Sequence, residues 1–477
     1  MAHPADLCQK LKVIEQCQVS PPPGSVPPTS LPLAFLDLPW VYCDTVQSIF
    51  FFEFPHSCNH FLQTVLPNLK HSLSLTLQQF FPFVGNLVIP PKPNFPHILY
   101  TSENSISFTI AESTADFPHL IADTARDVKD SHPFVPILPT PTTKEDGTWL
   151  LPLMAIQLTI FPEYGFSICI SFRHVVADAR AFLHFMKFWS YVCRTKHDVA
   201  ATQDLLPLLN RDIIKDPKGL KFVFSEELWN SPIESIIKTP PKVVDKNDDK
   251  VRHAFVLRRD HVAKLKKWVS IECKSTYGLE LESLHISTFV VTSALMWVCK
   301  VQSEEEVNAI TIANNNNNDE IYSLKFLGDC RNRPEFSIPS TYFGNCIVIR
   351  IVSLNRSKLM GEKGIVEAAI SIGRAVRDFQ FDAMKDVENF MSLGRSGRKV
   401  KHSSTIAGSP KLGTYETDFG WGKPKKCEIL HIEYSRTISL SDSRDEEGGV
   451  EVGLALGRAQ MSKFSAILEE YLRNIAI

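Results

Sequence analysis

Two segments of the chain place a histidine four positions before an aspartate, a spacing that could pair a general base with a carboxylate. They are HVVAD at residues 174–178 and HLIAD at residues 119–123. A neutral imidazole titrates near neutral pH and can accept the proton of a hydroxyl group. The spacing alone is a weak pattern, because a strand-end histidine bonded to a backbone carbonyl explains it better. The elements around each segment must therefore decide which histidine is functional.

The flanking sequence favours His174 over His119. Residues 166–172 alternate apolar and polar side chains, which predicts a β-strand directly before His174. Residues 182–193 carry apolar side chains at helical spacing directly after it. HLIAD instead follows a proline-containing acidic turn and continues into a charged segment. Because a strand-to-helix junction holds a side chain rigidly and leaves it accessible, His174 is predicted to be the functional base.

Two further motifs lie in the second half of the chain. YFGNC at residues 342–346 precedes a run of apolar residues, and DFGWG at residues 418–422 places a glycine on each side of Trp421. Glycine allows backbone angles that other residues avoid, and a buried tryptophan needs a partner for its indole N–H. Taken alone, each motif predicts only a tight turn.

Length and composition predict an α/β chain of more than one domain. The chain has 477 residues, of which 44 % are hydrophobic and 22 % are charged, as in globular proteins. Strand and helix patterns mix in both halves, and no short repeat is visible. A polar, proline-containing stretch separates the halves. The expected parts are an N-terminal domain at 1–195, a crossover at 196–252 and a C-terminal domain at 253–477.

Charge, cysteine spacing and hydropathy exclude several classes of function. The net charge of -2, without a basic block, argues against nucleic-acid binding. The 11 cysteines include no CxxC pair, so no metal site or redox dithiol is expected. No phosphate-binding loop or dinucleotide fingerprint occurs, so no permanently bound cofactor is expected. Without a signal peptide or an apolar run of ~20 residues, the chain is expected in the cytosol, away from membranes and with free thiols.

In the order HxxxD, YFGNC and DFGWG, the motifs resemble those of the plant BAHD acyltransferase family. The resemblance covers essentially the whole chain and includes LPLAFLDLPW, SLSLTLQQFFPFVGNL, GDCRNR and AGSPKL. It implies two domains similar to chloramphenicol acetyltransferase, with mixed sheets flanked by helices and an active-site channel between them. YFGNC resembles the subgroup that acylates the sugars of anthocyanins and other flavonoid or phenolic glycosides. The implied partners are an acyl-CoA co-substrate and a glycosylated acceptor, bound by a monomer.

The resemblance also implies a mechanism. His174 takes the proton of a sugar hydroxyl, which attacks the thioester carbonyl without a covalent acyl-enzyme. The resulting oxyanion needs a hydrogen-bond donor, for which the family suggests the indole N–H of Trp421. Asp418 has a catalytic part in some members, although on physical grounds it is expected mainly to hold its loop. Asp178 either orients His174 or pairs with Arg331, and the structural pairing is favoured.

Coenzyme A carries phosphates that require cations and backbone N–H groups. Family positions near this ligand are occupied by four small residues, Ser287, Thr288, Gly408 and Ser409. Helix capping explains the first two of them equally well.

The acyl donor stays open between two classes. Ala179 and Arg180 follow HxxxD where the family usually has glycine, an ending similar to that of members with aromatic donors. This favours a hydroxycinnamoyl donor. A malonyl donor would need a cation for its carboxylate, which Arg180 or Lys187 could supply. Further alternatives are an alcohol or amine acceptor and a catalytically silent member that binds ligands.

Overall fold

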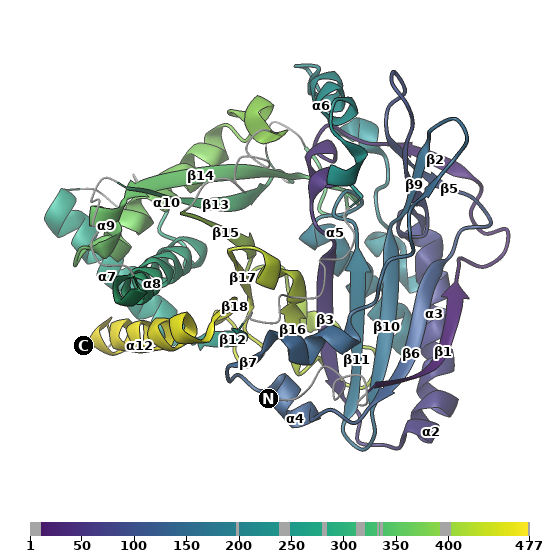
Figure 1. Ribbon diagram of the computed structural model, residues 1–477, viewed down its shortest axis with the longest axis horizontal. Coiled ribbons are helices and arrows are strands. Elements are labelled where there is room, and N and C mark those ends of the chain that lie inside the picture. The colour runs from purple at the N-terminus through teal and green to yellow at the C-terminus, as the bar shows by residue number, and fades with distance from the viewer. Residues whose placement is uncertain are drawn as a thin grey trace.

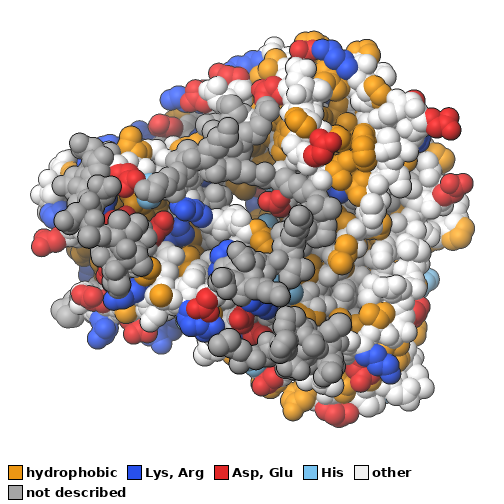
Figure 2. Space-filling model, in the orientation of Figure 1, with side chains coloured by type: hydrophobic (Ala, Val, Ile, Leu, Met, Phe, Trp, Pro, Cys, Tyr) orange, Lys and Arg blue, Asp and Glu red, His pale blue; other side chains and the backbone are white. Residues whose placement is uncertain are grey.

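The computed structural model describes residues 11–196, 200–237, 249–278, 284–311, 320–331, 333, 337–391 and 402–475. It consists of two lobes, each built on a mixed β-sheet flanked by helices (Figure 1). The predicted α/β class with two mixed, helix-flanked sheets is confirmed. The space-filling view shows a hollow between the lobes, with lysine and arginine side chains on its rim (Figure 2).

The first large sheet forms the N-terminal lobe, with the strand order β1-β6-β10-β11-β3-β16. Only β6 and β10 run parallel to each other. Every residue of β11 is buried, because the main core covers one face and a smaller apolar cluster covers the other. The strands are β1 (Leu11–Val19), β3 (Val46–Glu53), β6 (Ile106–Ser113), β10 (Met154–Phe161), β11 (Gly165–Phe172) and β16 (Lys426–Ile429).

Two long helices, α3 (Leu66–Gln79) and α5 (Ala179–Arg194), pack against each other in the main core of this lobe. The apolar stripe predicted at residues 182–193 is buried along α5. Pro67 lies just after the π-helical segment η2 (Phe61–Val65), which leads into α3, so the regular hydrogen-bond pattern of the helix is interrupted there. The other short helices and the strands of a small five-stranded sheet are α2 (Cys58–His60), α4 (Phe117–Ile121), β2 (Thr29–Pro32), β4 (Asn86–Ile89), β5 (His97–Tyr100), β8 (Thr142–Thr143) and β9 (Trp149–Pro152).

The C-terminal lobe is built on a sheet with the strand order β14-β13-β15-β17-β18-β12-β7. The long helix α8 packs against α7, α10 and α12. The strands are β7 (Arg126–Asp127), β12 (Lys250–Leu257), β13 (Ile321–Asp329), β14 (Ile347–Asn355), β15 (Ser403–Gly408), β17 (Thr437–Asp442) and β18 (Val450–Gly457). The helices are α7 (Arg259–Tyr277), α8 (Thr288–Thr311), α9 (Arg356–Met360), α10 (Gly364–Phe381) and α12 (Arg458–Ile475).

The lobes exchange one edge strand each. β16, from the C-terminal half, pairs with β3 of the first sheet, and β7, from the N-terminal half, pairs with β12 of the second. Helix α6 (Leu220–Trp229) also packs into the core of the N-terminal lobe, although it belongs to the expected crossover. The predicted boundaries therefore do not separate the two lobes cleanly. The central part of that crossover, residues 238–248, lies outside the described residues, as does the asparagine run at 314–318.

Within the described ranges, no helix is long and apolar enough to cross a bilayer. Each cysteine in the same ranges is a free thiol. No cluster of histidine, cysteine and acidic side chains among these residues has the arrangement of a metal site.

Candidate active site

His174 lies in the tight connection between β11 and α5. The Asp178 carboxylate caps α5 by accepting the backbone N–H of Ala181 at 3.0 Å. The backbone N–H of Arg173 donates to the carbonyl of Leu153 at 2.9 Å. Residues 175–178 are buried, whereas His174 is partly exposed. The strand-to-helix junction predicted around His174 is therefore present, and it presents the imidazole to solvent from a fixed turn.

The imidazole of His174 is stacked on the indole of Trp40. The ring centroids are 4.1 Å apart and the planes differ by 14°. Trp40 belongs to the 3-10 helix η1 (Leu38–Tyr42) and contacts Phe390 edge-on at 5.6 Å between centroids. Trp40 therefore covers one face of the imidazole and holds its plane, and Phe390 packs against Trp40.

Asn345 determines which imidazole nitrogen of His174 carries the proton. The Asn345 amide nitrogen faces three acceptors at 3.0–3.1 Å: an Asp37 carboxylate oxygen and the carbonyls of His174 and Val175. The amide oxygen must therefore face His174, whose Nδ1 lies 3.1 Å away. Nδ1–H donates to this oxygen, which leaves the lone pair on Nε2. Nε2 is thus free to accept a proton.

The environment also keeps His174 neutral. Removal from bulk water lowers the pKa of the imidazole below its ordinary value, although the Asp178 charge and the Asn345 hydrogen bond act in the opposite direction. A neutral imidazole is the form that a general base requires.

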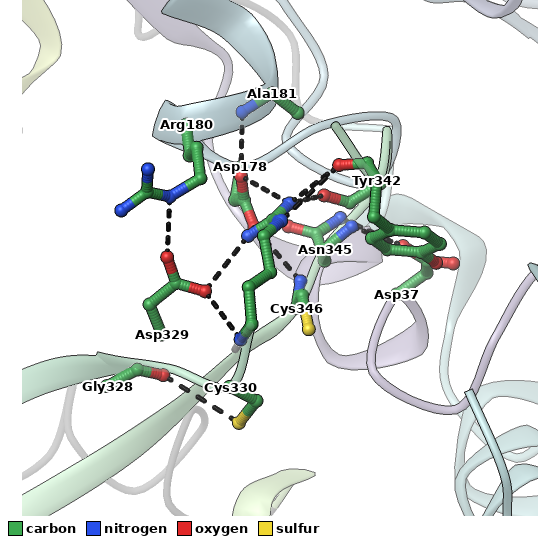
Figure 3. Close-up of polar contacts among 12 residues, drawn as sticks. Asp37, Asp178, Arg180, Ala181, Gly328, Asp329, Cys330, Tyr342, Asn345 and Cys346 are labelled. Carbon is green, nitrogen blue, oxygen red and sulfur yellow. Dashed lines mark hydrogen bonds and ion pairs between the residues drawn. The ribbon is translucent and has the colours of Figure 1, made fainter. Parts of the chain in front are cut away.

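Asp178 binds Arg331 through both carboxylate oxygens, at 2.8 and 3.1 Å (Figure 3). Both side chains are only 1 % exposed. The backbone N–H of Cys346 donates to the same carboxylate at 3.0 Å, and Arg331 donates to the carbonyl of Gly344 at 3.1 Å. Burial alone would raise the pKa of Asp178, but the charge of Arg331 and the hydrogen bonds from Arg331, Ala181 and Cys346 together outweigh burial and lower that pKa. Asp178 therefore joins the turn of His174 to the YFGNC loop as a buried carboxylate.

A second buried ion pair, Asp37–Arg211, also holds the YFGNC loop. The Arg211 guanidinium lies 2.7 Å from Asp37, and both side chains are at most 2 % exposed. Asp37 accepts the backbone N–H of Asn345 at 3.0 Å. A Cβ added to Gly344 would lie 2.1 Å from the Arg211 guanidinium, so glycine is required there. The two ion pairs together fix the loop that delivers Asn345 to His174.

The two proposed acyl-pocket cations already have partners. Arg180 donates to Asp329 at 2.7 Å, and Asp329 also contacts Arg331 at 3.1 Å (Figure 3). Lys187 donates to Glu416 at 2.5 Å and to the carbonyl of Leu412 at 2.9 Å. A malonyl carboxylate would have to compete with these groups.

The DFGWG motif lies at the other end of β11 from His174. Trp421 packs edge-on against Phe166 and Phe54, with centroids 6.0 and 6.1 Å apart. Phe166 is the second residue of β11, and the strand ends six residues later at Phe172. At ~3.3 Å per residue this separation is about 20 Å, whereas an oxyanion donor must lie ~3 Å from the oxygen. The prediction that Trp421 stabilises the oxyanion is therefore wrong.

Asp418 holds the DFGWG loop together. Its carboxylate accepts the backbone N–H groups of Gly420 and Gly422 at 2.8 and 3.0 Å. It also lies 3.7 Å from Arg194, at the last residue of α5. The catalytic part suggested by the resemblance is corrected, because Asp418 shares the distant position of Trp421.

The predicted coenzyme A positions lie at the N-terminus of α8 and the end of β15. The Ser287 hydroxyl accepts the backbone N–H of Val290 at 3.3 Å, which is a helix cap directly before Thr288. Gly408 has a φ of +79°, and an added Cβ would lie 2.3 Å from the carbonyl of Leu440. The Ser409 hydroxyl accepts the backbone N–H of Lys411 at 3.3 Å.

Positive charge collects around these positions. The pKa of Lys266, on α7, is lowered by desolvation and by the charge of Lys411. His285, two residues before Ser287, has a pKa lowered by desolvation and by the charges of Lys411 and Arg333. The charges of Lys411 and Arg333 thus act on His285 near the N-terminus of α8, and a region of positive charge attracts anions.

Several residues of the site are not predicted from the sequence, although most of them lie inside the family-like motifs. Trp40 and Asp37 belong to LPLAFLDLPW, and Asn345 belongs to YFGNC. The signal was the polar or aromatic residue inside each motif. Arg211 had no such signal, because its partner Asp37 is 174 positions away.

Comparison with known proteins identifies relatives over nearly the full length. The model of the Transferase family matches residues 10–471. The chain is 40 % identical to coumaroyl-CoA:anthocyanidin 3-O-glucoside-6''-O-coumaroyltransferase 1 of Arabidopsis thaliana, over 98 % of this chain and 99 % of that protein. It is 33 % identical to malonyl-coenzyme A:anthocyanin 3-O-glucoside-6''-O-malonyltransferase of Dahlia pinnata, over 98 % of this chain and 99 % of that protein.

Solved structures share the two-lobed fold at lower identity. Vinorine synthase aligns with a TM-score of 0.65 at 18 % identity, over 95 % of this chain and 96 % of that one. TRI101 of F. sporotrichioides aligns with a TM-score of 0.61 at 14 % identity, over 92 % and 97 %. The family match and the relatives at 33–40 % identity show that the chain belongs to the BAHD acyltransferase family.

Proposed function

We propose that the protein transfers an acyl group from an acyl-CoA to a sugar hydroxyl of an anthocyanin or flavonoid glycoside. The observation that carries this proposal is the neutral imidazole of His174, whose Nε2 lone pair is left free by the Asn345 hydrogen bond. Relatives at 33–40 % identity are named as acyltransferases with this donor and acceptor chemistry.

The geometry of the base supports a direct transfer. His174 Nε2 takes the proton of the sugar hydroxyl while the hydroxyl oxygen attacks the thioester carbon. The tetrahedral oxyanion collapses, the carbon–sulfur bond breaks, and the leaving thiolate takes the proton back from the imidazolium. No group of the enzyme is acylated, so the site needs no cysteine or serine nucleophile.

The residues around the N-terminus of α8 support coenzyme A as the carrier. Lys266, Lys411 and Arg333 supply positive charge beside the capped helix start at Ser287. Phosphate groups bind where cations and helix N-terminal N–H groups meet. We assign the phosphates of the co-substrate to this region.

We propose a hydroxycinnamoyl group as the donor's acyl part, with malonyl as the second candidate. Arg180 and Lys187 are both engaged by acidic partners, which disfavours a malonyl carboxylate at either cation. Trp40, which is stacked on His174 and largely buried, places an aromatic ring beside the base, and a planar acyl group would suit such surroundings. Relatives named for each donor are found, the coumaroyl one at the higher identity of 40 %.

We also propose that the protein acts as a cytosolic monomer. His174, Asn345 and both buried Asp–Arg pairs come from a single chain, so the site is complete without a second copy. Free thiols among the described cysteines suit a reducing compartment. Light scattering of the purified protein and the distribution of a fluorescent fusion would test these two points.

A donor panel tests the proposed function. Coumaroyl-, caffeoyl-, malonyl- and acetyl-CoA are each incubated with one anthocyanin glucoside, and product masses are measured. We expect coumaroyl or caffeoyl esters, formed at least ~10²-fold more slowly by His174→Ala. Malonyl ester as the main product would select the second donor. An alcohol and an amine acceptor are run in parallel, and the absence of product from every pair would identify a silent, ligand-binding member.

A further inference from the structure

A second histidine, His431, is carried to the His174 end of the first sheet by the exchanged strand β16. Ile429, the last residue of β16, pairs with Ser48 of β3, and the chain continues into the 3-10 helix η11 (Leu430–Tyr434). The backbone N–H of Gln47 then donates to Nδ1 of His431 at 3.1 Å. This hydrogen bond holds the imidazole at the start of β3, whose second residue is Gln47.

The register of the sheet places His431 close to His174. Gln47 lies opposite Ser171 of β11, three residues before His174. Neighbouring strands are ~4.8 Å apart, so β16 and β11 are separated by about 10 Å with β3 between them. The charge of His174 acts on His431, which also requires the two rings to be near each other. The site thus contains two imidazoles at the same end of the first sheet.

The two imidazoles have opposite hydrogen-bonding character. Nδ1 of His431 accepts from Gln47, so its proton lies on Nε2 and Nε2–H is a donor. His174 donates from Nδ1 and accepts at Nε2. Across the described part of the chain, Nε2 of His431 has no hydrogen-bond partner in the protein, and the side chain is partly exposed. One imidazole is arranged to take a proton and the other to offer a hydrogen bond.

His431 also stays neutral across the pH range of interest. Burial, together with the nearby charge of His174, lowers the pKa of its imidazole to about 4. Asp44 raises this pKa and Arg252 lowers it. The Nε2–H donor is therefore present without a change of charge whenever His174 is neutral.

We propose that Nε2–H of His431 donates a hydrogen bond to the thioester carbonyl oxygen as that oxygen becomes an oxyanion. The proposal rests on the proposed acyl transfer, and it fills the role that Trp421 cannot take from the far end of β11. The proton stays on His431 throughout. The charge that develops when the sugar oxygen attacks is stabilised until the carbon–sulfur bond breaks.

Two matched variants separate this role from a structural one. In His431→Asn the amide oxygen can still accept the Gln47 N–H, but no donor reaches the position of Nε2. In His431→Gln the amide nitrogen reaches that position. We expect the Asn variant to lose ~10²-fold in kcat, and the Gln variant less than ~10-fold, as for removal or replacement of an oxyanion donor. The KM for acyl-CoA and the Tm should stay near the wild-type values in both.

Hydrolysis of the acyl-CoA without a glycoside provides the second measurement. An oxyanion donor serves water as well as sugar, so the Asn variant should lose hydrolysis and transfer in parallel. Loss of transfer with unchanged hydrolysis would assign His431 to the sugar and overturn the proposal. Wild-type kcat in the Asn variant, or equal losses in both variants, would overturn it too. If the wild-type enzyme neither transfers nor hydrolyses any acyl group, the proposed function itself fails.

Discussion

The two HxxxD segments share their spacing but differ in what surrounds the histidine. His174 is stacked on Trp40 and hydrogen-bonded to Asn345, within a turn whose other residues are buried. His119, in the last turn of α4, is 45 % exposed and lies 3.2 Å from Asp130. The cavity beside His119 has a volume of about 70 Å³, too small for a glycoside.

The aspartates of the two segments are more alike than the histidines. Asp178 pairs with Arg331, and Asp123 pairs with Lys426 at 2.5 Å and with Arg444. In each case a residue of the N-terminal half binds cations of the C-terminal half. The shared spacing therefore corresponds to an ion pair between the halves, whereas the chemistry depends on Asn345 and Trp40, which lie outside the motif.

The largest expected effect is that of His174→Ala. Loss of a general base should lower kcat by ~10²–10⁴-fold while the protein stays folded. Steady-state kinetics with acyl-CoA and an anthocyanin glucoside measure kcat, and circular dichroism checks the fold. Near-normal turnover in this variant would show that His174 is no more functional than His119, the histidine of the other HxxxD segment.

Asp178→Asn should act mainly on stability. Removing one partner of a buried ion pair leaves the Arg331 charge with only the partly exposed Asp329, at a cost of about 3–5 kcal/mol in the free energy of unfolding. Asp123→Asn is the matched control and should cost less, because that carboxylate is 34 % exposed. Urea unfolding of both variants measures the difference. A stable Asp178→Asn protein without activity would instead indicate a direct catalytic part.

Asn345→Ala should lower kcat by roughly 10–100-fold, the range for residues that orient a functional histidine. Without the amide oxygen, Nδ1 of His174 loses the acceptor that holds its proton. Asp130→Ala removes the corresponding partner of His119 and should leave kcat unchanged. Equal effects of the two substitutions would contradict the assigned role of Asn345.

The pH profile of kcat/KM should fall on the acid side because His174 becomes protonated there. Because the folded pKa is lowered below the ordinary 6.5, the rate kcat/KM should be flat near neutral pH and fall below a midpoint under 6.5. The unfolded chain binds more protons in the same window, so stability should also fall as the pH drops below 6.5. A midpoint above 6.5 would show that the imidazole is not desolvated in this way. Rate profiles and thermal unfolding between pH 4.5 and 8, roughly the range in which histidines titrate, provide the data.

The smallest expected effect is that of His119→Ala. A substitution of an exposed side chain changes stability by less than about 0.5 kcal/mol, and turnover should stay within ~2-fold of wild type. The same kinetic assay applies. Loss of activity here would mean that the functional histidine was chosen wrongly.

The periodic elements around His174 could be predicted because their pattern lies in neighbouring residues. The alternation at 166–172 and the stripe at 182–193 appear as β11 and α5. The contact between His174 and Asn345 could not be predicted, since it joins residues 171 positions apart. β7 contains two residues, too few for a visible period. The predicted role of Trp421 was wrong for another reason. The order of motifs along the chain does not say which end of a strand a loop contacts.

The exchange of β7 and β16 has a consequence for protein engineering. A gene divided at the expected crossover would give two halves, each lacking an edge strand held by the other and each leaving an open sheet edge. Halves of two family members therefore cannot be recombined as independent modules. A working chimaera has to take residues 126–127 from the parent of the C-terminal lobe and residues 426–429 from the parent of the N-terminal lobe. The segments that must come from one parent are therefore those of one sheet, and they are not contiguous in the gene.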